Sequence, residues 1–160
     1  PVRCEAYHCL TRILLRNEPL MVAVHAQHRL LSTAKGLHLA DLVDENILIF
    51  PNYSKPNFST QIRSLFYEHG LDPAHLTEIR EVQLALGLVA ADEGICIIPE
   101  SARAIQIPNL IFIPLLDSTA ISPVFLAARN MDENSNIQSL LDCVYQVYDQ
   151  ESIVFTRKTI

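Results

Sequence analysis

The 160-residue sequence contains no tryptophan and only four glycines. It has no Gly-rich loop of the GxGxxG or P-loop type, which excludes the common ways of wrapping a pyrophosphate. No apolar run reaches the length of a membrane span, and the amino end PVRCEAYHCL has no signal-peptide core. We therefore expect a cytoplasmic protein that has no membrane partner.

Basic residues are also scarce. Lysine and arginine number 12 against 18 aspartates and glutamates, which gives a net charge of -6, and the basic residues are scattered. Because phosphate contacts supply most of the affinity for nucleic acid, this pattern argues against direct DNA binding by the chain. Hydrophobic residues make up 49% and charged residues 19%, a globular composition with ample material for a core.

None of the four cysteines forms a CxxC pair. Cys96 and Cys143 lie in apolar patterns and are predicted to be small core residues. Cys4, His8 and Cys9 fit no standard zinc spacing, and no second pair of ligands follows them. The sequence therefore predicts no metal site, and it supports no disulfide framework.

Catalytic signatures are absent as well. The sequence contains no GxSxG, HExxH or kinase motif, and its histidines form no recognisable pair with a nucleophile. Acidic neighbours such as Asp92 and Glu93 are interpreted as solvated loop and cap charges rather than as an acid–base pair. We therefore expect a protein that is not an enzyme and needs no cofactor, and a small α/β enzyme remains a remote alternative.

Strand-like and helix-like segments alternate along the chain. Apolar and β-branched runs predict strands at 20–26, 46–50, 76–80, 95–98, 110–114 and 123–128. Helical spacing predicts helices that start near residues 58, 81 and 134. Runs that are buried on both faces are typical of parallel sheets, so we expect an open α/β sheet with helices on both faces. In such sheets ligands bind beyond the carboxyl ends of the strands.

The segment EVQLALGLVAADEG is apolar nearly all round, which predicts a buried helix. Gly87 in its middle costs about 1 kcal/mol of helix propensity against alanine. We therefore expect Gly87 to let another element approach closely.

The stretch SKPNFST follows a predicted strand and precedes a predicted helix, which is the place expected for a ligand. The helix start offers backbone N–H groups without acceptors and a partial positive charge. The side chains of this stretch supply an ammonium group, amide and hydroxyl donors and an apolar surface, and its proline restricts the backbone before a ligand binds. The residues are Lys55, Pro56, Asn57, Phe58, Ser59 and Thr60. The set suits a small dicarboxylate or an aromatic acid.

A second explanation of the same residues is simple helix capping. Asn57 or Ser59 can cap a helix without any ligand, and such a cap stabilises by about 1 kcal/mol. The pattern of this stretch taken alone leaves both explanations open.

Longer motifs resemble those of a known family. LLRNEPLMVAVHAQHRL, FPNYSKPNFST, EIREVQLALGLVAADEGICIIPES and SPVFLAARNMDE are similar to the effector-binding domain of LysR-type transcriptional regulators. The resemblance runs over about residues 10–148 and is greatest to the muconate- and benzoate-responsive regulators of catechol and benzoate degradation. It implies a ligand sensor for aromatic catabolism, which binds a small carboxylate such as cis,cis-muconate or benzoate.

The resemblance also implies a Rossmann-like α/β fold similar to periplasmic binding proteins. Residues 18–117 would form a complete second regulatory subdomain, and 118–148 would return to the first. Residues 1–17 would be a remnant of that first subdomain, with 1–9 matching nothing in the family, and 149–160 would be a tail. In similar regulators the inducer lies between the two subdomains.

Two sets of site residues follow from the resemblance. The loop at 55–60 would hold the inducer carboxylate, largely through backbone N–H groups, which favours the pocket over simple capping. A second, apolar effector site would involve residues linked by an arginine–glutamate network: Arg16, Glu18, Arg80, Glu81 and Tyr148. Considered without the family, the two Arg–Glu pairs are ordinary surface ion pairs worth less than about 1 kcal/mol.

The sequence departs from the family in two respects. No winged helix-turn-helix is present, so we expect DNA contact only through such a domain outside this chain, and a homo-oligomer as the working form. A truncated regulator that acts as an interaction module without inducer binding is the alternative. Asp92 stands where similar regulators have glycine, and we expect it in the left-handed conformation that aspartate tolerates at some strain.

Overall fold

The computed structural model describes residues 10–32, 35–50, 58–129 and 134–158. Among these residues, none of the helices is both long enough and apolar enough to cross a membrane. The strands and main helices are β1 (Leu10–His25), β2 (Asn46–Ile49), α1 (Phe58–Glu68), β3 (His75–Glu78), α2 (Val82–Ala90), β4 (Ile95–Pro99), β5 (Leu110–Pro114), β6 (Ile121–Arg129) and α3 (Asn134–Gln150). Short 3-10 helices lie at Arg29–Ser32, Leu39–Leu42 and Glu100–Ala104.

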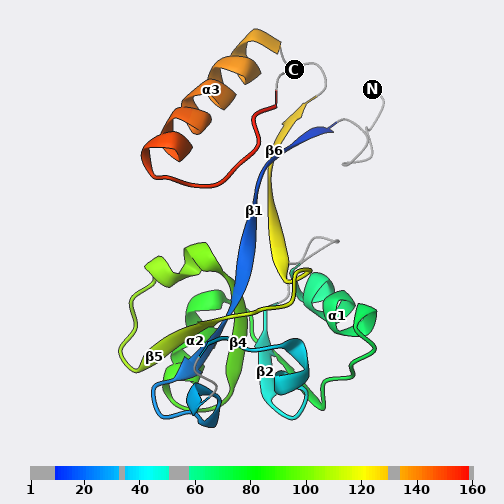
Figure 1. The fold of residues 1–160 in the computed structure, drawn as a ribbon, viewed down its shortest axis with the longest axis vertical. Coiled ribbons are helices and arrows are strands. Elements are labelled where there is room, and N and C mark those ends of the chain that lie inside the picture. The colour runs from blue at the N-terminus through cyan, green and yellow to red at the C-terminus, as the bar shows by residue number, and fades with distance from the viewer. Residues whose placement is uncertain (1–9, 33–34, 51–57, 130–133, 159–160) are drawn as a thin grey trace. The chain divides into compact units, whose positions relative to one another are not determined.

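The chain divides into two compact units. Unit 1 comprises residues 1–18 and 123–160, and unit 2 comprises residues 19–122. Strand β1 contributes to both, because its first nine residues belong to unit 1 and the rest to unit 2. Figure 1 shows β1 as the long blue strand.

The sheet of unit 2 is mixed. Its strand order is β3-β2-β4-β1-β5, and β2 pairs in parallel with both β3 and β4. Strand β1 pairs antiparallel with both β4 and β5, so β2 to β5 share one direction and β1 runs against them. The parallel arrangement expected from burial is therefore right for β2, β3 and β4 and wrong for β1. The reason is that β1 enters the sheet where β4 ends, with Leu20 opposite Pro99.

Each face of this sheet is covered by one helix, as expected (Figure 1). Alternate residues of β1, β2 and β4 point to opposite faces, and both sets are buried. One core joins the sheet to α1 through Leu20, Val22, Val24, Ile47, Ile49, Ile62, Leu65, Phe66, Ile95 and Ile97. The other core joins it to α2 through Ala23, Leu48, Ala85, Leu86, Val89, Cys96 and Ile98.

Helix α2 is less buried than its composition predicts. Ala85, Leu86 and Val89 face the core, but the Leu84 side chain is 55% exposed. Gly87 is exposed, and a Cβ atom placed on it would meet nothing within 4 Å. The prediction that Gly87 lets another element approach is therefore wrong for the described part of this chain, because Gly87 lies on the helix face opposite the sheet.

Unit 1 packs α3 against the first half of β1, which pairs with β6. Its core contains Ile13, Leu15, Leu141, Tyr145 and Tyr148, and Ile137 and Val144 of α3 pack against it. Cys143 is exposed, and its prediction as a core residue is wrong, because it lies about 200° around the helix from Leu141. Cys96 is buried as predicted, and desolvation raises the pKa of its thiol to about 12.

All three helices end in a left-handed residue: Gly70 (φ 67°), Asp92 (φ 63°) and Ser152 (φ 55°). The next residue then donates its N–H to a carbonyl five residues back, which is the Schellman motif. The prediction for Asp92 is confirmed. Only glycine takes this conformation without strain, so α2 and α3 end less favourably than α1.

Helix α1 is attached at both ends to the segment that leads out of unit 2. The Gln61 side chain donates to the Ile121 carbonyl at 2.7 Å. A His69 ring nitrogen lies 2.7 Å from the Thr119 hydroxyl. These contacts fix the helix along the connection that continues into β6.

We predict that Asp92→Gly raises the free energy of unfolding by about 0.5 kcal/mol, because relief of left-handed strain exceeds the added freedom of the unfolded chain. Gly70→Ala is the matched control. A Cβ atom there meets open space, so strain alone should lower the free energy of unfolding by about 1 kcal/mol. Urea denaturation followed by circular dichroism measures both variants, and a less stable Asp92→Gly protein would contradict the prediction.

We also predict that Gln61→Leu lowers the free energy of unfolding by about 1 kcal/mol, because the Ile121 carbonyl loses its donor. Gln83→Leu changes an exposed glutamine of α2 and should be close to neutral. Equal urea midpoints for the two variants would show that the Gln61 bond does not hold α1.

Candidate functional site

Two connections leave the sheet of unit 2 from the same edge. Strand β2 ends at Ile49 and β3 ends at Glu78, and these two residues face each other in the parallel pairing. The Ile79 N–H extends the ladder by donating to the Ile49 carbonyl at 2.8 Å. After β2 the chain continues to the start of α1, and after β3 it continues through Arg80 and Glu81 to α2. This edge lies at the carboxyl ends of parallel strands, where open α/β sheets bind ligands.

The first turn of α1 lacks an acidic residue, so nothing in it offsets the positive end of the helix dipole. Ser59 in this turn is 5% exposed, one of two buried polar residues in the described chain, and Thr60 is exposed. Lys55, Pro56 and Asn57 lie outside the described residues. The described part of the predicted loop therefore presents a helix start without an acidic residue in its first turn and with a buried serine.

An aromatic pair lies at the base of this loop. The Phe50 and Phe58 rings stack with centroids 4.9 Å apart and an interplanar angle of 8°. Phe58 was predicted to form an apolar wall of the ligand site, whereas the stacking of Phe50 on Phe58 was not predicted. Phe50 lies at the end of an apolar run, and that position indicated only a strand. The stack joins the residue after β2 to the first residue of α1.

Three residues predicted for the second effector site meet in unit 1. Arg16 donates to the Glu18 carboxylate from Nε at 3.0 Å and also from Nη2. The Arg16 Cζ atom lies 4.8 Å from the centroid of the Tyr148 ring. The side chains of Arg16 and Glu18 are 19% and 9% exposed, so this is a largely buried pair rather than an ordinary surface ion pair.

The charge of Arg16 is secured by its neighbours. Desolvation by burial lowers the pKa of the guanidinium, but the hydrogen bond and charge of Glu18 outweigh it, and the net pKa is raised. Removing one partner of such a pair leaves a buried charge without compensation, which costs several kcal/mol. The arrangement holds a permanent cation against an aromatic ring, a combination that suits an aromatic carboxylate.

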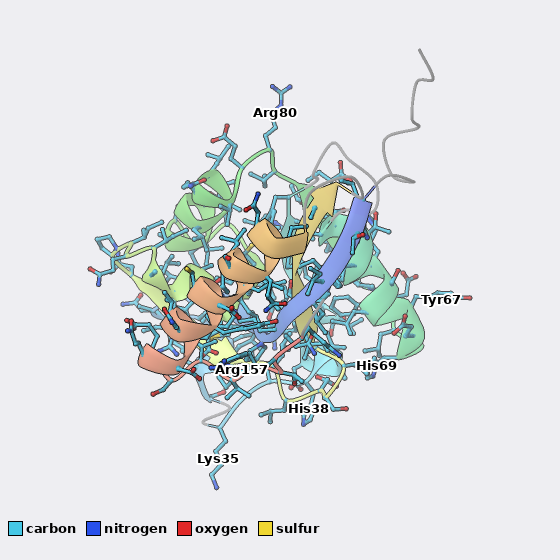
Figure 2. The ribbon with its side chains drawn as sticks, turned by 90° about the horizontal axis from the view of Figure 1, so that it is seen from above. Lys35, His38, Tyr67, His69, Arg80 and Arg157 are labelled. Carbon is cyan, nitrogen blue, oxygen red and sulfur yellow. The ribbon has the colours of Figure 1, made fainter. Side chains whose placement is uncertain are left out.

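Arg80 and Glu81 belong to unit 2. Glu81 is the N-cap of α2, and its carbonyl accepts the Ala85 N–H at 3.0 Å. Arg80 is exposed and extends away from the loop before α2 (Figure 2). The structure thus brings Arg16, Glu18 and Tyr148 together in unit 1 and places Arg80 and Glu81 in unit 2, between β3 and α2.

Comparisons with known proteins identify the family of the chain. A family model described as the LysR substrate binding domain matches residues 4–149. The HTH-type transcriptional regulator BenM of Acinetobacter baylyi is 54% identical over 143 residues, which cover 89% of this chain and 47% of that protein. The HTH-type transcriptional regulator CatR of Pseudomonas putida is 31% identical over 134 residues, covering 83% and 45%.

The fold matches a solved structure of the BenM effector binding domain with its effector benzoate. The TM-score is 0.88 at 49% identity, with 97% of this chain and 70% of that chain covered. The chain spans about half the length of the curated relatives it matches, and these relatives are transcriptional regulators. The predicted periplasmic-binding-protein-like α/β fold is therefore confirmed, and the chain belongs to the family of LysR-type effector-binding domains.

Proposed function

We propose that this domain senses cis,cis-muconate or benzoate for a regulator of aromatic catabolism. The observation that carries the proposal is the 54% identity to BenM, together with a solved BenM effector domain that contains benzoate. In this proposal unit 2 is the second regulatory subdomain, and unit 1 contains part of the first. The complete regulator would act as a homo-oligomer and would contact DNA through a winged helix-turn-helix domain.

The first effector site in this proposal is the loop at 55–60. The carboxylate would accept hydrogen bonds from N–H groups at the start of α1 and from the Ser59 side chain, and Lys55 would add a charge. The absence of acidic residues from the first turn supports an anion at this position. The Phe50–Phe58 stack reduces the ordering that remains when a ligand binds.

The second effector site would use the cation and ring of unit 1 for an aromatic acid. Arg16 supplies the charge, Tyr148 the ring, and Glu18 fixes the orientation of the guanidinium. Occupancy would then change the population of regulator conformations, as a ligand does when its affinity differs between two states.

We predict that Lys55→Ala weakens muconate binding about tenfold, because one charge-assisted contact to a carboxylate is lost. Isothermal titration calorimetry measures the dissociation constant. Lys35→Ala, which removes an exposed lysine of the same unit, should leave it unchanged. Equal affinities of the two variants would refute the carboxylate contact, and a wild-type protein that gives no heat with millimolar muconate or benzoate would refute effector binding.

We predict that the double variant Arg16→Met, Glu18→Gln loses benzoate binding at the second site and keeps the dissociation constant for muconate. Changing both residues leaves no buried charge without a partner, so the fold should survive. Arg12→Met, four residues earlier on the same strand and exposed, is the control. Calorimetric titration with each acid separates the two sites, and a parallel loss of both ligands would contradict a separate second site.

A further inference from the structure

The C-terminal segment, predicted only as a tail, is part of unit 1. After α3 ends, the Ile153 N–H donates to the Tyr148 carbonyl at 2.8 Å, which turns the chain back along the helix. Ile153 and Phe155 then pack against the core of unit 1. The segment therefore contacts the same helix face that carries Tyr148.

Phe155 lies between the two buried tyrosines of α3. Its ring stacks on that of Tyr145, with centroids 5.0 Å apart and an interplanar angle of 13°. It meets the Tyr148 ring edge-on, with centroids 5.3 Å apart and an angle of 66°. Both are favoured geometries for aromatic pairs. Tyr148 also contacts Arg16, so its ring is held between contacts to Phe155 and to the guanidinium.

Residues beyond Phe155 hold the segment in place. The Lys158 N–H donates to the Tyr145 hydroxyl at 3.0 Å. Arg157 lies beside α3 (Figure 2), pairs with Asp149 and places its Cζ atom 5.7 Å from the centre of the Tyr145 ring. The position of Phe155 is thus set by contacts on both sides of it in the sequence.

The same segment lines a cavity next to Arg16. The cavity has a volume of about 150 Å³, and its lining comes from residues 14–17 of β1 and from Val154, Phe155, Thr156 and Lys158. A cavity of about this size in another protein holds benzene. Leucine and phenylalanine walls with a guanidinium and an ammonium group at the side fit one aromatic ring with a carboxylate.

We propose that Phe155 is a positioning residue of the second effector site, where it fixes the Tyr148 ring against Arg16 for a single-ring aromatic carboxylate. This inference rests on the proposed function of that site. It adds the C-terminal segment, 139 positions after Arg16 in the sequence, to the residues that set the response to an aromatic acid.

Three variants test the proposal. Phe155→Leu removes the ring and keeps apolar bulk, Phe155→Tyr keeps the ring, and Val147→Ala changes a side chain of α3 that is 51% exposed and does not line the cavity. The first readout is the NMR shift of the Arg16 side-chain protons, which the Tyr148 ring current displaces. We expect this displacement to be lost in Phe155→Leu and kept in the other two. Wild-type shifts in a folded Phe155→Leu protein would overturn the proposal.

The second readout is calorimetric titration of the complete chain with benzoate and with muconate. Phe155→Leu should weaken benzoate binding about tenfold, Phe155→Tyr should stay within twofold of wild type, and muconate binding should not change. If the affinities for both acids fall together, Phe155 acts on the fold alone and the proposal fails. A wild-type protein that binds muconate but not benzoate refutes the second effector site itself, whereas equal benzoate affinities of wild type and Phe155→Leu refute only the role of Phe155.

Discussion

The burial of strand β1 on both of its faces is the constraint on which the rest of the structure depends. Leu20, Val22 and Val24 face the core under α1, while Ala23 faces the core under α2. Complete burial of a branched side chain contributes about 1.5–3 kcal/mol, so these few residues hold both helical layers against the sheet.

The part of β1 that belongs to unit 1 carries a largely buried ion pair between Arg16 and Glu18. Burial of the Glu18 carboxylate would be costly without Arg16. The hydrogen bonds between the two side chains and the contact of Arg16 with Tyr148 offset the cost of removing both charges from water.

Helix α1, which begins after the candidate ligand loop, is held by contacts near both of its ends. The Phe50–Phe58 stack secures its first residue, and bonds from Gln61 and His69 secure its two ends to residues 119–121. These contacts join α1 to the residue after β2 and to residues just before and at the start of β6, all within unit 2.

The sequence alone determined what depends on neighbours along the chain. Apolar periodicity predicted the three α-helices and most of the strands but missed the first ten residues of β1, the left-handed turn at Asp92 followed from the glycine that similar regulators have there, and long motifs identified the family. The tertiary structure decided the reversed direction of β1, the exposure of Gly87 and the contact of Phe155 with Tyr148. These features depend on which surfaces meet when distant segments pack, and such meetings leave no period or local spacing in the sequence.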